Sequence, residues 1–419
     1  MAASGLSRPC QAPPDGEAGS GQGLAHPVSA ALFTADGLAD PFPLYARLRA
    51  SERVAWVEPP QGEGSWMVTR FEDAHRVLTS RSFSSDPVVG GSPDGHEPGS
   101  GPLSRVMTNC DAPRHTVLRD SVKRYFAASR VAALRPRIQA VADQLIDEHI
   151  PSGRMDLAGD FAYALPMTII LELLGLPLGD AALFVEWSRV LIDCDLEMTA
   201  GEVARRSRVA DHDVVSYLTA VLEDRRRQTR DDMISGLLDL DLVQADLVGL
   251  VWLVLADGFE TIGSFIGNAM VALLGDPHSL MADLRADPGL LGPAVEELLR
   301  YDSPGATVRR YARQAIEIGG RRIAAGDSVI VVLTSANRDE DRFERPDWIW
   351  PRRGDQGHMA FGRGAHACFG AALARAECQI GIGTLLRRLP RLRLAVPPEQ
   401  LVWRGSLMLH GLGHIPVEL

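Results

Sequence analysis

The stretch His358–Leu373, HMAFGRGAHACFGAAL, decides how the rest of the chain is interpreted. It places one cysteine, Cys368, after a glycine-bearing loop and before residues 369–389, whose small and long apolar side chains predict a helix. Cys368 is therefore expected at a helix N-terminus, where unpaired backbone N–H groups favour a negatively charged sulfur. The glycines allow the backbone to bend tightly and to approach something large and flat. A lone thiolate held in this way suits one axial bond to a metal cofactor.

Taken alone, a single cysteine near a helix start is most often a small buried hydrophobic residue. The spacing around Cys368 favours a different interpretation. The pattern Phe361-Gly362-x-Gly364-x-His366-x-Cys368-x-Gly370 fixes six positions in ten residues, so a chance match is rare. It is similar to the haem-binding signature of the cytochrome P450 family, and the chain resembles the soluble bacterial members most closely.

Length and composition indicate a large soluble protein. The chain has 419 residues, of which 46% are hydrophobic, and this is ample for a large core. A net charge of −11 argues against a general nucleic-acid surface. The five cysteines are scattered and lack CxxC spacing, so neither a disulfide framework nor a zinc site is predicted, which fits a reducing cytoplasm.

The domain organisation follows from the N-terminal composition. Residues 1–27 are rich in Gly, Pro, Ala and Ser without an apolar run, so we expect a flexible tail rather than a signal peptide or membrane anchor. The longest clean apolar stretch, 247–256, is too short to span a bilayer. For residues 28–419 the resemblance implies one mainly α domain with small β-sheets, shaped like a triangular prism, with haem between a long central helix and the helix that follows Cys368.

Periodicity and turn residues predict the main elements. Helices are expected at 40–51, 71–79, 111–126, 130–150, 158–175, 179–192, 201–228, 232–238, 242–275, 294–301 and 369–389. Strands are expected at 54–57, 65–69, 307–312, 315–318, 322–323 and 328–332. Asp111 is the expected N-cap of its helix. The resemblance implies that the loop at 80–103 roofs the substrate pocket.

Residues 242–275 are apolar for most of their length and predict the longest helix, buried in the core. Its middle carries Gly258, Glu260 and Thr261, and polar groups in such a position are costly unless they serve a purpose. Thr261 can simply bond back to the carbonyl of Asp257. The resemblance implies more: the three residues match the family's Gly-x-acid-Thr stretch, in which the acid and the alcohol deliver protons during oxygen activation.

Asp257 departs from the family pattern, which usually has Ala or Gly there. It lies four residues before Thr261 and so on the same helix face. Partial desolvation should raise the pKa of its carboxyl unless a cation pairs with it. We expect Asp257 either to bind a basic or hydroxylated substrate group or to join the proton relay; alternatively, a local helix rotation turns it into a water-filled groove.

His115 and Arg119 are four residues apart and share a helix face, which by spacing alone is equally consistent with two solvated side chains. The resemblance implies that both hold the haem propionates together with Arg310 and His366. It further implies that Cys368 ligates the iron, that Phe361 packs near the haem and sulfur, and that backbone N–H groups from Gly370 onward tune the sulfur.

The resemblance also implies a set of structural ion-pair residues and a set of pocket-lining residues. Glu297 and Arg300 match a Glu-x-x-Arg pair that forms a buried structural ion network with a second arginine, for which Arg353 aligns best and Arg352 is the alternative. The expected pocket-lining residues are Ala306, Thr307 and Val308, with Met408 and Leu409 at a hairpin tip.

The implied activity is that of a haem-thiolate monooxygenase, which hydroxylates or epoxidises an organic molecule, here a natural-product intermediate. The chain carries no flavin or iron–sulfur motif, so electrons would come from NAD(P)H through a reductase and a ferredoxin. Arg363, Arg375, Arg387 and Arg388 are expected to form a basic docking face, although for Arg387 and Arg388 a plain solvated surface is an equal alternative. We expect a monomer without nucleic-acid or membrane partners. The alternatives are a peroxide-driven haem-thiolate enzyme and a non-catalytic haem-binding or recruitment protein of the same fold.

Overall fold

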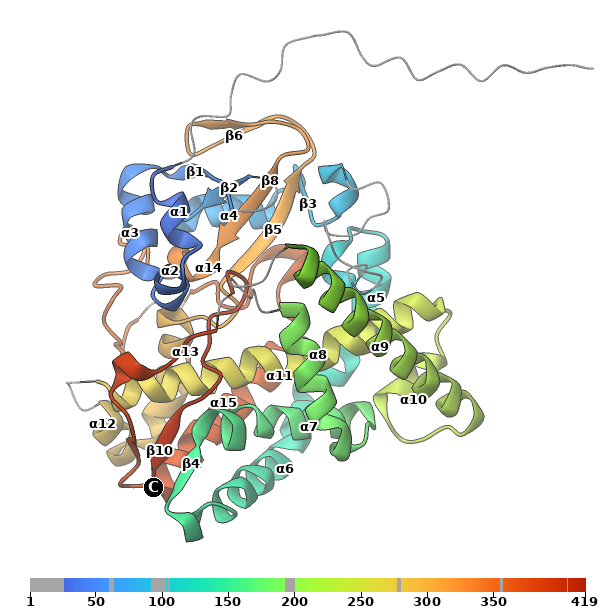
Figure 1. The fold of residues 1–419 in the computed structure, drawn as a ribbon, viewed down its shortest axis with the longest axis vertical. Helices are drawn as coiled ribbons and strands as arrows, with labels where there is room; N and C mark the ends of the chain where they lie inside the picture. Colours follow the sequence, from blue (N-terminus) through green and yellow to red (C-terminus); the bar gives the residue numbers. More distant parts are fainter. Residues whose placement is uncertain are drawn as a thin grey trace, which may run out of the picture.

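The computed structural model describes residues 26–59, 64–91, 103, 106–192, 200–276, 280–354, 357–404 and 406–419. The predicted tail lies outside these ranges except for its last two residues, and residues 92–102 of the predicted loop over the pocket also lie outside them. Figure 1 shows a sheet-rich part beside a larger helical part.

Helices make up most of the described chain. The longer ones are α3 (Phe42–Ser51), α4 (Phe71–Thr79), α5 (Arg114–Lys123), α6 (Ala128–Asp147), α7 (Ala164–Leu174), α8 (Ala181–Ile192), α9 (Ala200–Arg227), α11 (Gln244–Leu274), α13 (Leu291–Tyr301) and α15 (Ala371–Arg388). The shorter ones are α1 (Ser29–Leu32), α2 (Ala35–Ala39), α10 (Met233–Leu238), α12 (Leu280–Ala286) and α14 (Leu333–Ala336), with a π-helical turn η6 (Leu157–Ala162) before α7.

The main sheet has five strands in the order β1-β2-β8-β5-β3. Its strands are β1 (Val54–Val57), β2 (Ser65–Val68), β3 (Phe83–Ser84), β5 (Thr307–Ala312) and β8 (Ser328–Val332). β1 and β2 form an antiparallel pair in which Trp56 faces Trp66, with ring centroids 5.2 Å apart edge to face. β2 pairs with β8 in parallel, and β8 pairs with β5 in antiparallel register. One face of this sheet packs on α4, burying Val68, Val77 and Val329.

Two smaller sheets complete the strand inventory of the described residues. One joins β4 (Arg154–Asp156), β10 (Pro416–Glu418) and β9 (Arg393–Leu394), and the other pairs β6 (Ile316–Ile318) with β7 (Arg321–Ile323). β10 is the last strand, so it ties the C-terminus to the segment that precedes η6.

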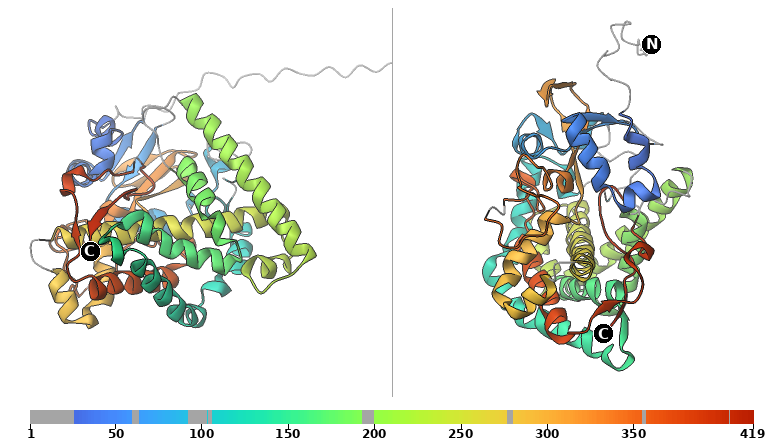
Figure 2. Two further views of the ribbon diagram at one scale, coloured as in Figure 1. Left: turned by 60° about the horizontal axis from the view of Figure 1, so that its bottom comes forward. Right: turned by 90° about the vertical axis from the view of Figure 1, so that its left-hand side faces the viewer.

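α11 is the central element of the fold. Its 31 residues span about 47 Å, and the right-hand view of Figure 2 looks nearly along it through the middle of the molecule. The helix is apolar on most sides, and these sides are buried against α7, α9 and α15, as expected for a core helix. Two stretches, Leu157–Leu174 and Gln244–Leu274, are long and apolar enough to cross a membrane, but 67% and 83% of their apolar windows are buried inside the fold.

The predicted elements agree closely with the observed ones, whose ends differ by a few residues at most positions. The prediction that Asp111 caps α5 is wrong. The helix starts at Arg114, and the Asp111 carboxylate instead accepts hydrogen bonds from Ser84 and from the Ser85 amide at 3.2 Å. The carboxylate is therefore used to hold the β3 edge rather than the helix end.

Candidate active site

The loop before α15 is shaped by two glycines. Gly362 and Gly364 have φ angles of +66° and +75°, in the left-handed region that other residues rarely adopt. A Cβ on Gly364 would also lie 2.4 Å from the carbonyl oxygen of Leu78 at the end of α4. The Cys368 amide then donates to the Phe361 carbonyl at 2.9 Å, which closes the loop. Only glycine fits at 364, and the closed loop fixes where the Cys368 sulfur lies.

Cys368 lies two residues before Gly370, the N-cap of α15, and its thiol keeps water-accessible surface. Burial by the surrounding protein raises the pKa of the thiol, although the Gly370 amide and the charges of Arg119 and Arg375 oppose this. The prediction that the helix N-terminus would by itself favour a thiolate therefore underestimated desolvation. A bound metal ion would be needed to displace the thiol proton.

The middle of α11 carries water-accessible surface between two buried segments. Asp257 is exposed while Val254, Leu255 and Ala256 before it are buried. Burial among the surrounding groups nevertheless raises the pKa of Asp257 to about 6, and the charge of Glu260 adds to this shift. A side chain that is both water-accessible and desolvated lines an internal hollow. The thiol of Cys368 has the same combination of properties and lies within range of the Asp257 charge, so we infer that both face one hollow.

The side chains of Thr261 and Glu260 have different hydrogen-bond partners. The Thr261 hydroxyl donates to the backbone carbonyl of Asp257 at 2.8 Å, which is the local bond that its sequence position allows. Glu260 is 1% exposed, and its carboxylate accepts from the Ser188 hydroxyl at 2.7 Å and forms an ion pair with Arg404. The acid is therefore held by groups outside its own helix.

The partners of Glu260 are functional candidates that the sequence analysis missed. Arg404 also donates to the Tyr163 hydroxyl at 3.1 Å, and this hydroxyl lies 3.0 Å from that of Ser264 one turn further along α11. Arg404 belongs to the C-terminal segment, and Tyr163 lies between η6 and α7. No local pattern in the sequence links these residues to the central helix, because their contacts depend on the tertiary fold.

A cluster of basic side chains lies on the other predicted cofactor elements. The rings of His115 and His366 have centroids 4.0 Å apart, and Arg119 lies near the ring of Phe369. Burial lowers the pKa of His366 to about 3, with Arg310 and His115 contributing, and it lowers that of Arg310 to about 10. These four basic groups, His115, Arg119, Arg310 and His366, are therefore crowded where positive charge is poorly solvated.

This cluster fits an anionic ligand. Within the described part of the chain neither Arg119 nor Arg310 has an ion-pair partner, and the buried Nε2 of His115 has no hydrogen-bond partner. A dicarboxylate such as the propionates of haem would relieve both deficits. With the free sulfur of Cys368 and the glycine-shaped loop, the residues present fit the haem that the resemblance implies.

The structure brings Glu297, Arg300 and Arg353 together. Arg300 donates two hydrogen bonds of 2.9 Å to the Glu297 carboxylate, and Arg353 donates to it at 3.1 Å. All three side chains are at most 5% exposed. The alternative, Arg352, lies on the surface instead, 3.6 Å from Asp287 and 67% exposed.

The two segments expected to line the substrate pocket lie together. The Ala306 amide donates to the Met408 carbonyl at 2.9 Å, and the Thr307 hydroxyl donates to the Leu407 carbonyl at 3.0 Å. Leu409 is buried and Met408 is 62% exposed, while Val308 is half-buried in β5. The C-terminal turn is therefore held against the start of β5.

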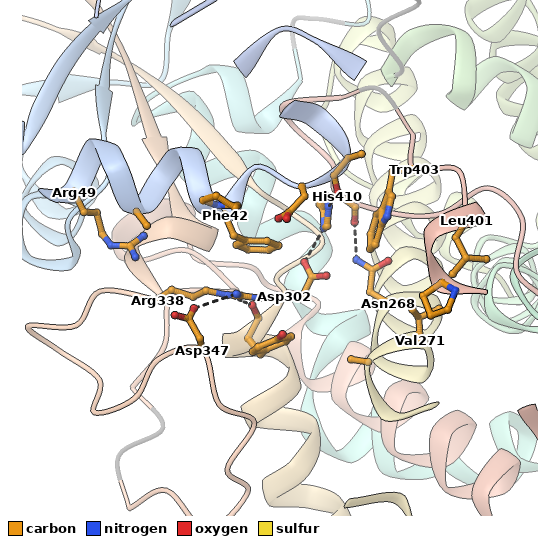
Figure 3. Close-up of a pocket in the computed structure, with 17 residues that line it drawn as sticks. Phe42, Arg49, Asn268, Val271, Asp302, Arg338, Asp347, Leu401, Trp403 and His410 are labelled. Carbon is orange, nitrogen blue, oxygen red and sulfur yellow. Dashed lines mark hydrogen bonds and ion pairs between the residues drawn. The ribbon is translucent and has the colours of Figure 1, made fainter. Parts of the chain in front are cut away.

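A second cavity, of about 560 Å³, lies behind this turn and contains none of the predicted active-site residues (Figure 3). His410 stacks on Trp403 with centroids 4.1 Å apart and pairs with Asp302 at 2.8 Å. Across the cavity, the Arg338 guanidinium lies 3.6 Å from the ring centroid of Phe42. These contacts brace the C-terminal segment from the side away from Cys368.

The arginines near Cys368 are largely occupied. Arg375 forms a two-point ion pair with Glu296 at 2.6 and 2.8 Å, and Arg363 donates to carbonyls of its own loop. Arg387 and Arg388 pair with Asp143, and Arg388 also pairs with Asp147. The expected basic face is therefore neutralised in part by acidic neighbours.

Comparisons with known proteins agree with this geometry. The family model described as Cytochrome P450 matches residues 195–403. The chain is 39% identical to cytochrome P450 monooxygenase PikC of Streptomyces venezuelae, covering 91% of this chain and 92% of that protein. It is 35% identical to 6-deoxyerythronolide B hydroxylase of Saccharopolyspora erythraea, covering 90% and 95%. The structure of a myxobacterial cytochrome P450 with myristic acid matches at a TM-score of 0.85 and 36% identity, over 93% of this chain and 98% of that one.

Proposed function

Because this chain belongs to the cytochrome P450 family and is a haem-dependent monooxygenase, we propose that it oxidises a medium-sized to large natural-product intermediate by hydroxylation or epoxidation. The observation that carries the proposal is that the exposed Cys368 residue lies within range of the charge of the exposed Asp257 residue of α11, in a chain that also gathers four basic groups around His366.

In this proposal the basic cluster would bind the haem propionates and Cys368 would provide the sulfur ligand of the iron. Haem held in this way would supply the oxidising chemistry, and the sulfur would tune its reactivity. The Gly370 amide forms a hydrogen bond to the sulfur and so stabilises negative charge on it. Phe361 covers the loop side, where its ring lies 4.4 Å from the Arg375 guanidinium.

Proton delivery is assigned to Glu260 and Thr261. At rest the Thr261 Oγ1 proton is held on the Asp257 carbonyl, and the Glu260 carboxylate is held by Ser188 and Arg404. A proton that Glu260 takes up from water can therefore pass towards the hollow only when the Glu260 side chain turns away from Arg404, and Thr261, the next residue along α11, is the group that would receive it. This arrangement makes Arg404 a positioning residue for the acid.

The relatives support the substrate class. One relative is a 6-deoxyerythronolide B hydroxylase, and the side chains expected to line the pocket here are mostly apolar, as Ala306, Val308 and Leu409 illustrate. The proposal includes a single haem domain over residues 28–419, a monomer, a cytoplasmic location, and electrons from NAD(P)H through a reductase and a ferredoxin.

The test is a screen of natural-product intermediates against purified, haem-loaded protein. Substrates are detected by the spectral change that follows displacement of iron-bound water, and hits are then turned over with NAD(P)H, a reductase and a ferredoxin. The proposal expects an oxygenated product that depends on the ferredoxin. Turnover with peroxide alone would support the peroxide-driven alternative, and haem binding without turnover by either route would support the non-catalytic one.

A further inference from the structure

Asp257 is an acidic side chain without a counter-charge. Within the described residues its carboxylate has no hydrogen bond and no ion pair; the one bond at this position is made by its backbone carbonyl. Glu260, three residues along the same helix, is by contrast fully engaged by Ser188 and Arg404. Asp257 and Glu260, both in the middle of α11, are therefore in opposite states: Glu260 is paired inside the protein and Asp257 is open to the hollow.

The surroundings make an unpaired carboxylate at this position unfavourable. Burial and the charge of Glu260 both raise the pKa of Asp257. The described residues expected to line the rest of the pocket carry no charge: Ala306, Thr307, Val308, Met408 and Leu409. Nothing among them compensates the carboxylate, so the compensation is left to whatever occupies the hollow.

Participation in proton delivery is the weaker interpretation of Asp257. The Thr261 hydroxyl bonds to the Asp257 backbone and not to its carboxylate, so the structure contains no side-chain relay from Asp257 to Thr261. Rotation into an outer groove is also disfavoured, because the position is desolvated. With these two roles disfavoured, substrate recognition is the role that fits the observed position of the Asp257 carboxylate.

We propose that Asp257 is the anchor for a cationic group of the substrate, such as an amine that is protonated at neutral pH. The inference rests on the proposed function and narrows its substrate class to basic natural-product intermediates. An ion pair in this hollow joins two poorly solvated charges, so the substrate is oriented with its basic group at α11 and the remainder towards the apolar lining.

The experiment compares two probes of equal chain length, decyltrimethylammonium and 1-decanol, by spectral titration of the haem-loaded protein. The quaternary ammonium has no lone pair, so its spectral change reports binding in the hollow rather than ligation of iron. The variants are Asp257→Asn and, as a control that removes the same charge from an exposed position before α11, Asp241→Asn.

The proposal expects wild type and Asp241→Asn to bind the ammonium probe more tightly than the alcohol. Asp257→Asn should weaken ammonium binding by about tenfold or more and change alcohol binding by less than about threefold. Equal affinity of wild type for both probes, or an equal loss for both in Asp257→Asn, would overturn it. A carbon monoxide difference spectrum of each variant separates this result from failure of the proposed function, which would show as loss of the thiolate-ligated band in wild type.

Discussion

Glu260, in the middle of α11, forms a buried ion pair with Arg404, which lies 144 residues later in the C-terminal segment. Both side chains are at most 7% exposed. The acid assigned to proton delivery is thus held by the segment whose next residues, 406–409, lie against the pocket-lining start of β5. The position of this acid and the shape of the pocket wall are therefore coupled through one arginine.

Replacement of Arg404 tests that coupling. Arg404→Met leaves Glu260 buried without its counter-charge, so we expect the free energy of unfolding to fall by about 3–5 kcal/mol in urea denaturation. The double variant Glu260→Gln/Arg404→Met should recover much of this loss. Arg393→Met, which removes a pair with Glu418 that is 71% and 44% exposed, is the matched control and should cost less than about 1 kcal/mol. Equal effects of the two arginine variants would contradict the account.

The Glu297 network offers a comparison of neighbouring arginines. Arg353→Ala leaves the buried Glu297 carboxylate with one arginine fewer, so we expect a loss of about 3–5 kcal/mol and poor recovery of folded, haem-loaded protein. Arg352→Ala removes an exposed side chain and should be within about 1 kcal/mol of wild type. Thermal denaturation of both variants measures the difference, and the assignment of Arg353 fails if Arg352→Ala proves the more damaging.

The pair of His410 and Asp302 makes stability depend on pH. Burial opposes the protonated ring, but Asp302 outweighs this and raises the pKa of His410. The folded state therefore keeps the proton at pH values where the unfolded state, with a pKa of about 6.5, has lost it. The stabilisation is complete below about pH 6.5 and is lost as pH rises through the folded pKa, at up to about 1.4 kcal/mol per pH unit. Urea denaturation from pH 6 to 9 should show this slope in wild type and a flatter one in His410→Gln; identical slopes would contradict it.

Arg310 should act in opposite directions with and without haem. Without haem it is buried in a crowd of basic groups, so Arg310→Gln should stabilise the apoprotein in urea denaturation. In the proposed haem site Arg310 holds a propionate, so we expect the same variant to lose haem to apomyoglobin faster than wild type. Arg309→Gln, an exposed neighbour in β5, should change neither measurement. Slower or unchanged haem loss in Arg310→Gln would remove Arg310 from the propionate site.

Features of the structure that depend on neighbouring residues are predicted best from the sequence. The apolar run of α11 and the glycine spacing around Cys368 place these elements correctly because helix period and left-handed φ angles are properties of neighbouring residues. Prediction from the sequence fails where a long-range contact decides. Arg404 and Ser188 are unremarkable in sequence, and only packing shows that they hold Glu260. Asp111 has the local features of an N-cap, but Ser84 and Arg313 occupy its carboxylate.

The pKa of the Cys368 thiol is a second case in which long-range contacts decide the outcome. A helix N-terminus lowers a thiol pKa by a local effect that the sequence reveals, whereas the opposing desolvation depends on everything packed around the sulfur. The predicted rise in the pKa of Asp257 agrees with the structure, because an acid on a buried helix is desolvated whatever its detailed contacts. Only the structure could show that no residue in the described part of the chain pairs with this carboxylate.

The central claim is that the Cys368 sulfur is the axial ligand of the haem iron. The most direct test is the carbon monoxide difference spectrum of reduced, haem-loaded wild type, Cys368→Ser and Cys378→Ala, where Cys378 is a buried cysteine within α15 and serves as the control. We predict the red-shifted band of thiolate-ligated haem in wild type and in Cys378→Ala, and its loss in Cys368→Ser. Retention of that band in Cys368→Ser, or its absence from wild type that has bound haem, would contradict the account.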